Sequence, residues 1–471
     1  MSHLLSRRGV LLSATSSQRK ESEPKESIFT SEDYLEAAKQ AARWIDSVAT
    51  ETADGITWLP EPDHKEKTST VSSPLTLYSG NAGIVLFLLQ LSQVTQQDEY
   101  LQKAKRGADL LVKQWPSVAT FKSGLLASPY SFYNGLGGVA FTLLETWKVS
   151  GQERYREAAL AITKEISQAA KPASKGITWT GSPAVGFGDS GIILYLLHAA
   201  DRLNDESYRH LAAEAGEHLL SVAKEDPRGG LRWYGFTNPE QFKFPRDSYF
   251  PNFEIGTAGT AYTLARLYEA NKDKRFIDAA EGGALHLRNI ATVKGDSALV
   301  YYREPDLRGL YYLGYCHGPT GTARLFYQLH KVTGRPEHLA WTEKLARGIV
   351  ESGVPDQQTP GFWYVVCQCC GSAGVSDFFL GLAAGTGKKE YLAVARKFSD
   401  QLLSRGTNFD GNGYRWYQAW TRVKPAEVSA ETGYMIGAAG EGAALLHAYL
   451  ISEKRHWTSA FPDNPFPLTA G

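Results

Sequence analysis

The 471-residue sequence has only four cysteines, and all of them lie between residues 316 and 370. Four thiols grouped so closely in so long a chain do not resemble the disulfide framework of a small secreted domain. We therefore expect reduced cysteines that are available to a metal ion.

The chain also lacks any excess of charge, because its 50 basic residues balance its 50 acidic ones. A nucleic-acid-binding domain is normally basic, so this composition argues against one. No apolar run reaches the roughly 18 to 20 residues that span a bilayer, which excludes an integral membrane protein. The composition predicts a globular protein with no nucleic acid partner, and we expect it in the cytoplasm.

The N-terminus contains two adjacent arginines, Arg7 and Arg8, followed by a short apolar patch at residues 10–12. A twin-arginine pair can belong to an export signal, but this patch is too short for the core of a signal peptide. The polar run that follows is typical of a disordered tail. We expect residues 1–28 and 456–471 to be tails and residues 29–455 to form one domain.

A Gly-x-x-Gly pattern followed by a strongly apolar stretch occurs seven times along the chain. Successive first glycines are 53 to 68 residues apart, which indicates an internal repeat. The seven pairs are Gly80 and Gly83, Gly135 and Gly138, Gly188 and Gly191, Gly256 and Gly259, Gly318 and Gly321, Gly371 and Gly374, and Gly437 and Gly440.

Amphipathic helical patterns lie between these motifs, and the clearest one, at residues 31–49, has a capping-box-like start at Thr30 and Asp33. An amphipathic helix can face water, whereas a helix that is apolar nearly all round must be covered on most sides. Seven pairs of helices meet both conditions when the apolar helices form a covered inner ring and the amphipathic helices form an outer ring that faces water. The sequence therefore predicts an all-α, double-layered α/α toroid, since an open solenoid would need polar capping repeats that are not evident.

Glycine at the start of an inner helix lets the backbone turn sharply and lets neighbouring helices approach closely. All seven N-termini, with free N–H groups and positive dipole ends, would then lie at one face of the ring, where we expect the chemistry. Runs such as GITW at residues 55–58 and GLRW at residues 230–233 precede many motifs. They predict brief strands or extended loops, with aromatic side chains packed at the barrel mouth.

Two adjacent motifs carry cysteine just before the predicted inner helix. Cys316 lies two residues before Gly318, while Cys369 and Cys370 lie directly before Gly371. A closed ring would bring these three thiols together, and helix dipoles favour the thiolate form that zinc requires. Three protein ligands and one open position are typical of catalytic zinc.

Other uses of these cysteines stay open at this point. They could pack as small hydrophobes, form a closed structural zinc site that includes Cys367, or have a redox role. Four cysteines in two equivalent motifs are unusual for packing alone, and an open catalytic zinc explains the pattern best.

The sequence resembles the lanthionine synthetase C-like proteins, the cyclases of lanthipeptide biosynthesis and their relatives. The resemblance runs from about residue 30 to residue 452 and is sharpest at YCHGPTG and CCGSAG, which are similar to the zinc motifs of that family. It implies an α/α toroid and a zinc-activated addition of a cysteine thiol to dehydroalanine or dehydrobutyrine. By the same resemblance Cys316 is the first zinc ligand, Cys369 is the second, and Cys370 stands where a histidine is usual.

Two further positions depart from the family pattern. Members usually carry an aspartate before the third glycine motif and a histidine directly before the fourth, where this chain has Ala184 or Val185 and Ile255. His317, beside the first ligand, is the first candidate for moving the proton, with a role in orienting a ligand as its alternative. Glu254 is the second candidate.

The predicted function is a zinc-dependent, lanthionine synthetase-like cyclase that takes a dehydrated precursor peptide and depends on a separate dehydratase. One alternative is a zinc-bearing thiol- or peptide-binding protein without cyclase activity. The other is a carbohydrate-active toroid enzyme, which needs two carboxylates about 5 to 10 Å apart. Glu254 and Asp189 are the only two carboxylates in the motifs that could form such a catalytic pair. Asp189 is better explained as a carboxylate that interacts with a helix dipole.

Overall fold

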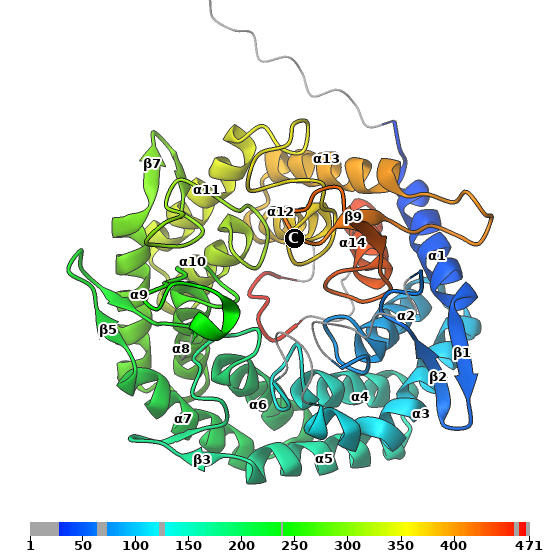
Figure 1. Cartoon of the computed structure of the whole chain (residues 1–471), viewed down its shortest axis with the longest axis horizontal. Coiled ribbons are helices and arrows are strands. Elements are labelled where there is room, and N and C mark those ends of the chain that lie inside the picture. The colour runs from blue at the N-terminus through cyan, green and yellow to red at the C-terminus, as the bar shows by residue number, and fades with distance from the viewer. Residues whose placement is uncertain (1–27, 64–72, 122–127, 237–238, 456–460, 468–471) are drawn as a thin grey trace, which may run out of the picture.

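The computed structural model describes residues 28–63, 73–121, 128–236, 239–455 and 461–467. Fourteen α-helices in this part of the chain form two concentric layers (Figure 1). The inner layer contains α2 (Asn81–Thr95), α4 (Leu136–Ser150), α6 (Asp189–Leu203), α8 (Thr257–Asn271), α10 (Pro319–Thr333), α12 (Ser372–Thr386) and α14 (Ala438–Ser452). The outer layer contains α1 (Ser31–Ser47), α3 (Asp98–Thr120), α5 (Glu153–Gln168), α7 (Glu206–Ser221), α9 (Lys274–Ile290), α11 (Pro336–Glu351) and α13 (Lys389–Arg405). The predicted all-α, double-layered α/α toroid is confirmed.

Some predicted features lie outside the described residues. These are the N-terminal tail up to residue 27, with Arg7 and Arg8, and residues 456–460 and 468–471 of the expected C-terminal tail. Within the described ranges, no helix is both long enough and apolar enough to cross a membrane.

The inner helices share one length and one way of starting. Each is 15 residues long and follows directly on the first glycine of its motif, which is an extended N-cap. The second glycine lies where neighbouring motifs touch. A Cβ atom at Gly321 would lie 2.6 Å from the Cβ atom of Phe253, and one at Gly83 would lie 2.6 Å from that of Tyr434. The close approach was predicted between inner helices, whereas at both positions the helix packs against the loop that precedes a neighbouring inner helix.

The outer helices bury only one side. In α1, Leu35, Ala38 and Ile45 are buried, while the predicted capping box of Thr30 and Asp33 closes the N-terminus of the helix. This arrangement leaves the charged face of each outer helix in water and its apolar face on the inner ring.

Short antiparallel hairpins connect the layers. They pair β1 (Ala49–Thr52) with β2 (Gly55–Trp58), β3 (Lys171–Pro172) with β4 (Ile177–Thr178), β5 (Lys224–Glu225) with β6 (Leu231–Arg232), β7 (Thr292–Lys294) with β8 (Ser297–Leu299), and β9 (Tyr417–Ala419) with β10 (Val428–Ala430). The run at residues 55–58 is therefore a strand, as predicted.

The expected place at the barrel mouth is wrong for two tryptophans of these runs, Trp179 and Trp233. The indole N–H groups of Trp179 and Trp233 donate to the carbonyl oxygens of Ile166 and Leu219, at 2.6 and 2.8 Å. These two carbonyls belong to the outer helices α5 and α7. A buried indole needs an acceptor, and the last turn of an outer helix supplies free carbonyl groups. Trp179 and Trp233 thus fasten their hairpins to the outer layer and do not line the mouth.

The ring closes where the last repeat meets the first. In the inner layer α14 packs against both α12 and α2, and α1 covers it from outside (Figure 1). The backbone N–H of Met435 donates to the carbonyl oxygen of Tyr78 at 2.8 Å. The Ser31 hydroxyl donates to Glu453 at 2.6 Å.

Residues 461–467, which we expected within the C-terminal tail, lie in the centre of the ring (Figure 1). Asp463 is buried there and accepts hydrogen bonds from the hydroxyls of Tyr133, at 2.8 Å, and Tyr315, at 2.6 Å. It also pairs with Arg324 at 3.3 Å. This segment fills the interior of the ring and contacts the residue that precedes Cys316.

Candidate metal centre

Backbone hydrogen bonds join the seven motifs at the residue two positions before each first glycine. In six of the links the N–H of this residue donates to the carbonyl oxygen of the equivalent residue in a neighbouring motif, over 2.8 to 3.1 Å. In the seventh link the side-chain amide of Asn134 donates to the carbonyl oxygen of Gly186 at 3.2 Å. We call these seven residues the motif ring: Tyr78, Tyr133, Gly186, Glu254, Cys316, Cys369 and Met435.

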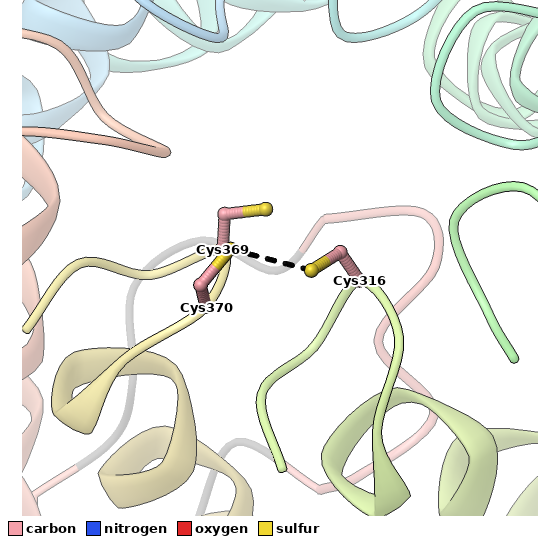
Figure 2. Close-up of side chains that lie close together, drawn as sticks. All are labelled: Cys316, Cys369 and Cys370. Atoms are coloured by element: carbon pink, nitrogen blue, oxygen red, sulfur yellow. Dashed lines mark hydrogen bonds between the residues drawn. The ribbon is translucent and has the colours of Figure 1, made fainter. Parts of the chain in front are cut away.

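The motif ring brings together the three cysteines that the sequence singled out. The backbone N–H of Cys316 donates to the carbonyl oxygen of Cys369 at 3.1 Å. The sulfur atoms of Cys316, Cys369 and Cys370 all lie within 4.8 Å of one another, and those of Cys316 and Cys370 are 3.3 Å apart. Figure 2 shows that the three side chains come from the two loops that enter α10 and α12. Cys316 and Cys369 are buried, and Cys370 is half-buried.

All four cysteines are free thiols. Cys367 is also buried. Among the described residues, however, Cys367 is in neither of the two groups whose ligand atoms lie close enough to share one metal ion. The geometry therefore favours three converging thiols over four.

The three sulfur atoms share protons unequally. Hydrogen bonds from Cys316 and Cys370 lower the pKa of Cys369 well below its usual value. The same contact with Cys369 raises the pKa of Cys316, and contacts with Cys316, Cys367 and Cys369 raise the pKa of Cys370. Crowded thiols can hold only one negative charge without a cation, whereas a bound metal ion would stabilise all three as thiolates.

The three thiols fit zinc. Tetrahedral ligation with Zn–S bonds of about 2.3 Å places two sulfur atoms roughly 3.8 Å apart, and the spacing of the cluster is compatible with that value. The loops end at the N-termini of α10 and α12, whose partial positive charge favours thiolates. Three protein sulfur ligands leave one position of a tetrahedron for a further group.

Glu254 and His317 lie beside the first cysteine. Their ligand atoms and the sulfur of Cys316 are all within 4.8 Å of one another. Burial, with the charge of Cys369 as the next cause, raises the pKa of Glu254 well above its usual value. A Cβ atom on Gly186 would lie 2.9 Å from the carboxylate of Glu254, so glycine leaves room for that side chain.

His317 lies among aromatic rings. Its ring centre is 4.9 Å from that of Tyr302, 5.7 Å from that of Phe250 and 5.9 Å from that of Tyr312. Burial lowers the pKa of His317 to about 4, so the imidazole is neutral at neutral pH. Its Nδ1 atom is buried and has no hydrogen-bond partner in the described part of the chain. This nitrogen is thus available to a bound molecule.

The positions that depart from the family pattern form an apolar wall. The backbone N–H of Val185 donates to the carbonyl oxygen of Glu254 at 2.9 Å, which places this stretch next to the motif ring. Ala184 and Ile255 belong to a small apolar cluster of their own. Its buried members are Ala184, Phe187, Phe236, Phe250 and Ile255.

Asp189 does not face the thiols as a free carboxylate. It is fully buried in the first turn of α6 and accepts hydrogen bonds from the N–H groups of Trp179 and Thr180, at 3.1 and 3.0 Å, and from the hydroxyls of Thr178 and Thr180. Its oxygens therefore hold the β4 loop onto the helix.

Two tyrosines at the site, Tyr312 and Tyr78, escaped the sequence analysis. The ring centres of Tyr302 and Tyr312 are 4.2 Å apart, and Trp363 packs on Tyr312 at 5.3 Å. Burial, with the charges of Cys369, Glu254 and Cys370 as further causes, raises the pKa of Tyr78 well above its usual value. The repeat register could have identified Tyr78, because it occupies the same motif position as Cys316 and Cys369.

The chain is similar to a family of known proteins and to several solved structures. The family model described as lanthionine synthetase C-like protein matches residues 71–461. Among solved structures, nisin cyclase is similar with a TM-score of 0.60 and 17% sequence identity, over 89% of this chain and 94% of that chain. An α-1,6-mannanase of Salegentibacter sp. gives a TM-score of 0.45 and 15% identity, over 88% of this chain and 99% of that chain. The comparison with curated protein sequences found no match to this chain.

Proposed function

Because the chain belongs to the lanthionine synthetase C-like family, we propose that it is a zinc-dependent cyclase that adds a cysteine thiol to a dehydroalanine or dehydrobutyrine of a peptide. The observation that carries this proposal is the convergence of three thiols at one position of the motif ring. Cys316, Cys369 and Cys370 would hold the zinc. Zinc bound there would supply a Lewis acid that lowers the pKa of a substrate thiol.

The reaction is an addition with no change of oxidation state. The substrate sulfur loses its proton and bonds to the β-carbon of the dehydrated residue, and the α-carbon then receives a proton. Three thiolate ligands leave the metal site with one net negative charge, which keeps a further thiolate weakly held and nucleophilic.

The proton requires a group beside the reacting atoms. His317 is the first candidate, because its neutral ring has an unpartnered buried nitrogen next to Cys316. Glu254 is the second, since its carboxyl group lies within the same cluster. The aspartate and histidine usual in the family are replaced by apolar side chains, so Glu254 and His317 would take over the transfer of the proton.

The same proposal names the partners. The substrate is a dehydrated precursor peptide, and a separate dehydratase would have to act on that peptide first. The aromatic group of Tyr302, Tyr312 and Trp363 would contact the peptide next to His317. We place this reaction in the cytoplasm.

The first test is the zinc content of the purified chain and of its Cys316→Ala, Cys369→Ala double variant. We expect about one zinc per chain in the parent and none in a folded double variant. The parent is then given a peptide that contains one cysteine and one dehydroalanine. Ring closure leaves the mass of the peptide unchanged but removes the thiol that alkylates, whereas zinc binding without this loss would rule out the cyclase.

A second candidate function is a zinc-bearing protein that binds a thiol or a peptide without cyclising it. The apolar wall around Ala184 and Ile255 favours it, because the usual acid and base are absent there. Saturable binding of the test peptide with no loss of its thiol would support this alternative. A carbohydrate-active enzyme is the weaker candidate, because the carboxylate of Asp189 already accepts hydrogen bonds from Trp179 and Thr180.

A further inference from the structure

Residues 461–467, which we call the central segment, pack inside the ring against its inner helices (Figure 1). The ring of Phe461 packs on Phe141 of α4, with ring centres 5.7 Å apart. The ring of Phe466 packs on Phe378 of α12 at 5.6 Å. The central segment thus spans the interior from one side of the inner layer to the other.

Within the central segment, Asp463 accepts hydrogen bonds from two motifs that are three repeats apart. Its side chain is buried, with 1% exposed. One carboxylate oxygen, Oδ2, accepts from the hydroxyl of Tyr133 at 2.8 Å and from that of Tyr315 at 2.6 Å. Tyr133 precedes the second glycine pair and Tyr315 precedes the fifth. The backbone links of the motif ring join neighbouring motifs, whereas this carboxylate joins two motifs across the ring.

Arg324 of α10 supplies the counter-charge for this carboxylate. Its guanidinium lies 3.3 Å from Oδ1 of Asp463 and donates to the backbone carbonyl oxygen of the same residue at 3.2 Å. The guanidinium also lies over the ring of Tyr315, 4.6 Å from its centre. A buried carboxylate is costly unless it is paired and hydrogen-bonded, and both conditions are met here. Tyr315 is therefore held on its face by Arg324 and at its hydroxyl by Asp463.

The tyrosine held in this way directly precedes Cys316, the first proposed zinc ligand. The backbone N–H of Cys316 donates to Cys369 at 3.1 Å, and its carbonyl oxygen accepts from the N–H of Glu254 at 2.9 Å. These two bonds hold Cys316 in the motif ring. The contact between Tyr315 and Asp463 holds the preceding residue from the interior, so the ligand loop is fastened on two sides.

The loop of the second ligand is fastened in an equivalent way by its own helix. Gln368, the residue before Cys369, donates its side-chain amide to Asp377 of α12 at 2.8 Å. Asp377 lies six residues after the first glycine of its motif, and α10 has Arg324 at the equivalent position. The central segment therefore brings to α10, by pairing Asp463 with Arg324, the carboxylate that α12 carries in its own sequence.

We propose that Asp463 is a positioning residue for the metal centre, which holds Tyr315 and with it the loop that carries Cys316. This inference rests on the proposed zinc site but not on cyclase activity. It concerns the mobility of one ligand loop, which can be measured without substrate and without metal.

The experiment compares Tyr315→Phe with Tyr133→Phe, because each change removes one hydroxyl from the same oxygen of Asp463 and both tyrosines are 2% exposed. Hydrogen exchange at the backbone N–H of Cys316 is followed by mass spectrometry in the metal-free chains. It becomes about fivefold faster in Tyr315→Phe, the effect of losing one hydrogen bond of average net strength, and keeps the parent rate in Tyr133→Phe. Asp463→Ala gives at least the change of Tyr315→Phe, and combining the two adds nothing, because both remove the same contact.

Zinc affinity, measured by competition with a coloured chelator, follows the same order. It falls roughly tenfold in Tyr315→Phe, the lower end of the range for residues that hold a ligand, and is unchanged in Tyr133→Phe. Equal exchange at Cys316 and equal zinc affinity in the two variants would overturn the role of Asp463 while leaving the cyclase intact. A difference between the variants without thioether formation by the parent would overturn the cyclase alone, and a folded parent that binds no zinc would overturn both.

Discussion

Cys316 and Cys369 are held together by their backbones, since the N–H of the first donates to the carbonyl oxygen of the second at 3.1 Å. The distance between the two thiols is therefore set by the ring of motifs and not by the metal. A chain without bound metal would keep the two sulfur atoms close, which is how a preorganised metal site is built.

The first prediction separates the three thiols of the cluster from the fourth cysteine. Cys370→Ala removes a ligand and lowers the affinity for zinc by more than about 100-fold. Mutation of a residue that only contacts a ligand already lowers metal affinity roughly 10- to 100-fold, so the loss of a ligand should exceed that range. Cys367→Ala is the matched control and keeps the affinity within about tenfold, because Cys367 is outside the cluster. Competition with a coloured chelator measures both. An equal loss of zinc affinity in the two variants would show that all four thiols bind the metal in a closed site.

The second prediction concerns the transfer of the proton. Glu254→Gln and His317→Phe each slow thioether formation by roughly 100-fold, the lower end of the range for general acid–base catalysis, while the zinc content stays unchanged. Asp189→Asn is the control, because its carboxylate holds the β4 loop and not the site. Rates are measured on a peptide with one dehydroalanine. If neither variant slows the reaction, the proton comes from water or from the peptide.

The third prediction tests the close packing of an inner helix against the neighbouring motif. Gly321→Ala places a Cβ atom 2.0 Å from the carbonyl oxygen of Tyr315 and 2.6 Å from the Cβ of Phe253. Overpacking of this kind lowers the free energy of unfolding by about 1 to 3 kcal/mol. Gly309→Ala is the control, since its added Cβ meets no atom within 4 Å. Urea unfolding followed by circular dichroism gives both values, and equal stabilities would contradict the packing.

The fourth prediction is a pH dependence of stability. His286 is fully buried against the hydroxyl of Tyr249, and burial lowers its pKa from 6.5 to about 4. Between these two values the folded chain binds fewer protons than the unfolded chain, so the free energy of unfolding falls as the pH drops from 6.5 towards 4. The loss from this group is up to about 3 kcal/mol.

Urea titrations at pH values across this window measure the effect. His286→Gln has a shallower slope than the parent, while His210→Gln, a change at an exposed side chain, keeps the parent slope. A parent whose stability does not change over this range would show that His286 is charged in the folded chain.

The sequence predicted the toroid because one physical signal is repeated seven times. A glycine pair at the start of an apolar helix is visible without any knowledge of tertiary contacts, and Cys316 and Cys369 could be placed together because they share a register. Tyr312 was missed for the opposite reason. It belongs to none of the seven motifs, and its contact with Tyr302, with ring centres 4.2 Å apart, appears only in the folded chain.

Two other features could not be predicted from a pattern. Residues 461–467 have no periodicity that points to the interior, and the buried pair of Asp463 and Arg324 appears only when the ring is assembled. The tryptophans of the hairpin runs were placed at the mouth because aromatic residues suit a binding surface. Trp179 and Trp233 instead satisfy their indole N–H groups on outer helices, and a sequence does not show where free carbonyls will lie.

The closure of the motif ring fixes the order in which the site can be completed. Cys316 and Cys369 belong to neighbouring repeats and can meet while a nascent chain is still open. The backbone N–H of Cys369 donates to the carbonyl oxygen of Met435, which in turn donates its own N–H to Tyr78, so these two links need the seventh repeat. A chain that stopped before Met435 would carry all three thiols but would lack both links. Only the finished circle supplies the last hydrogen bond.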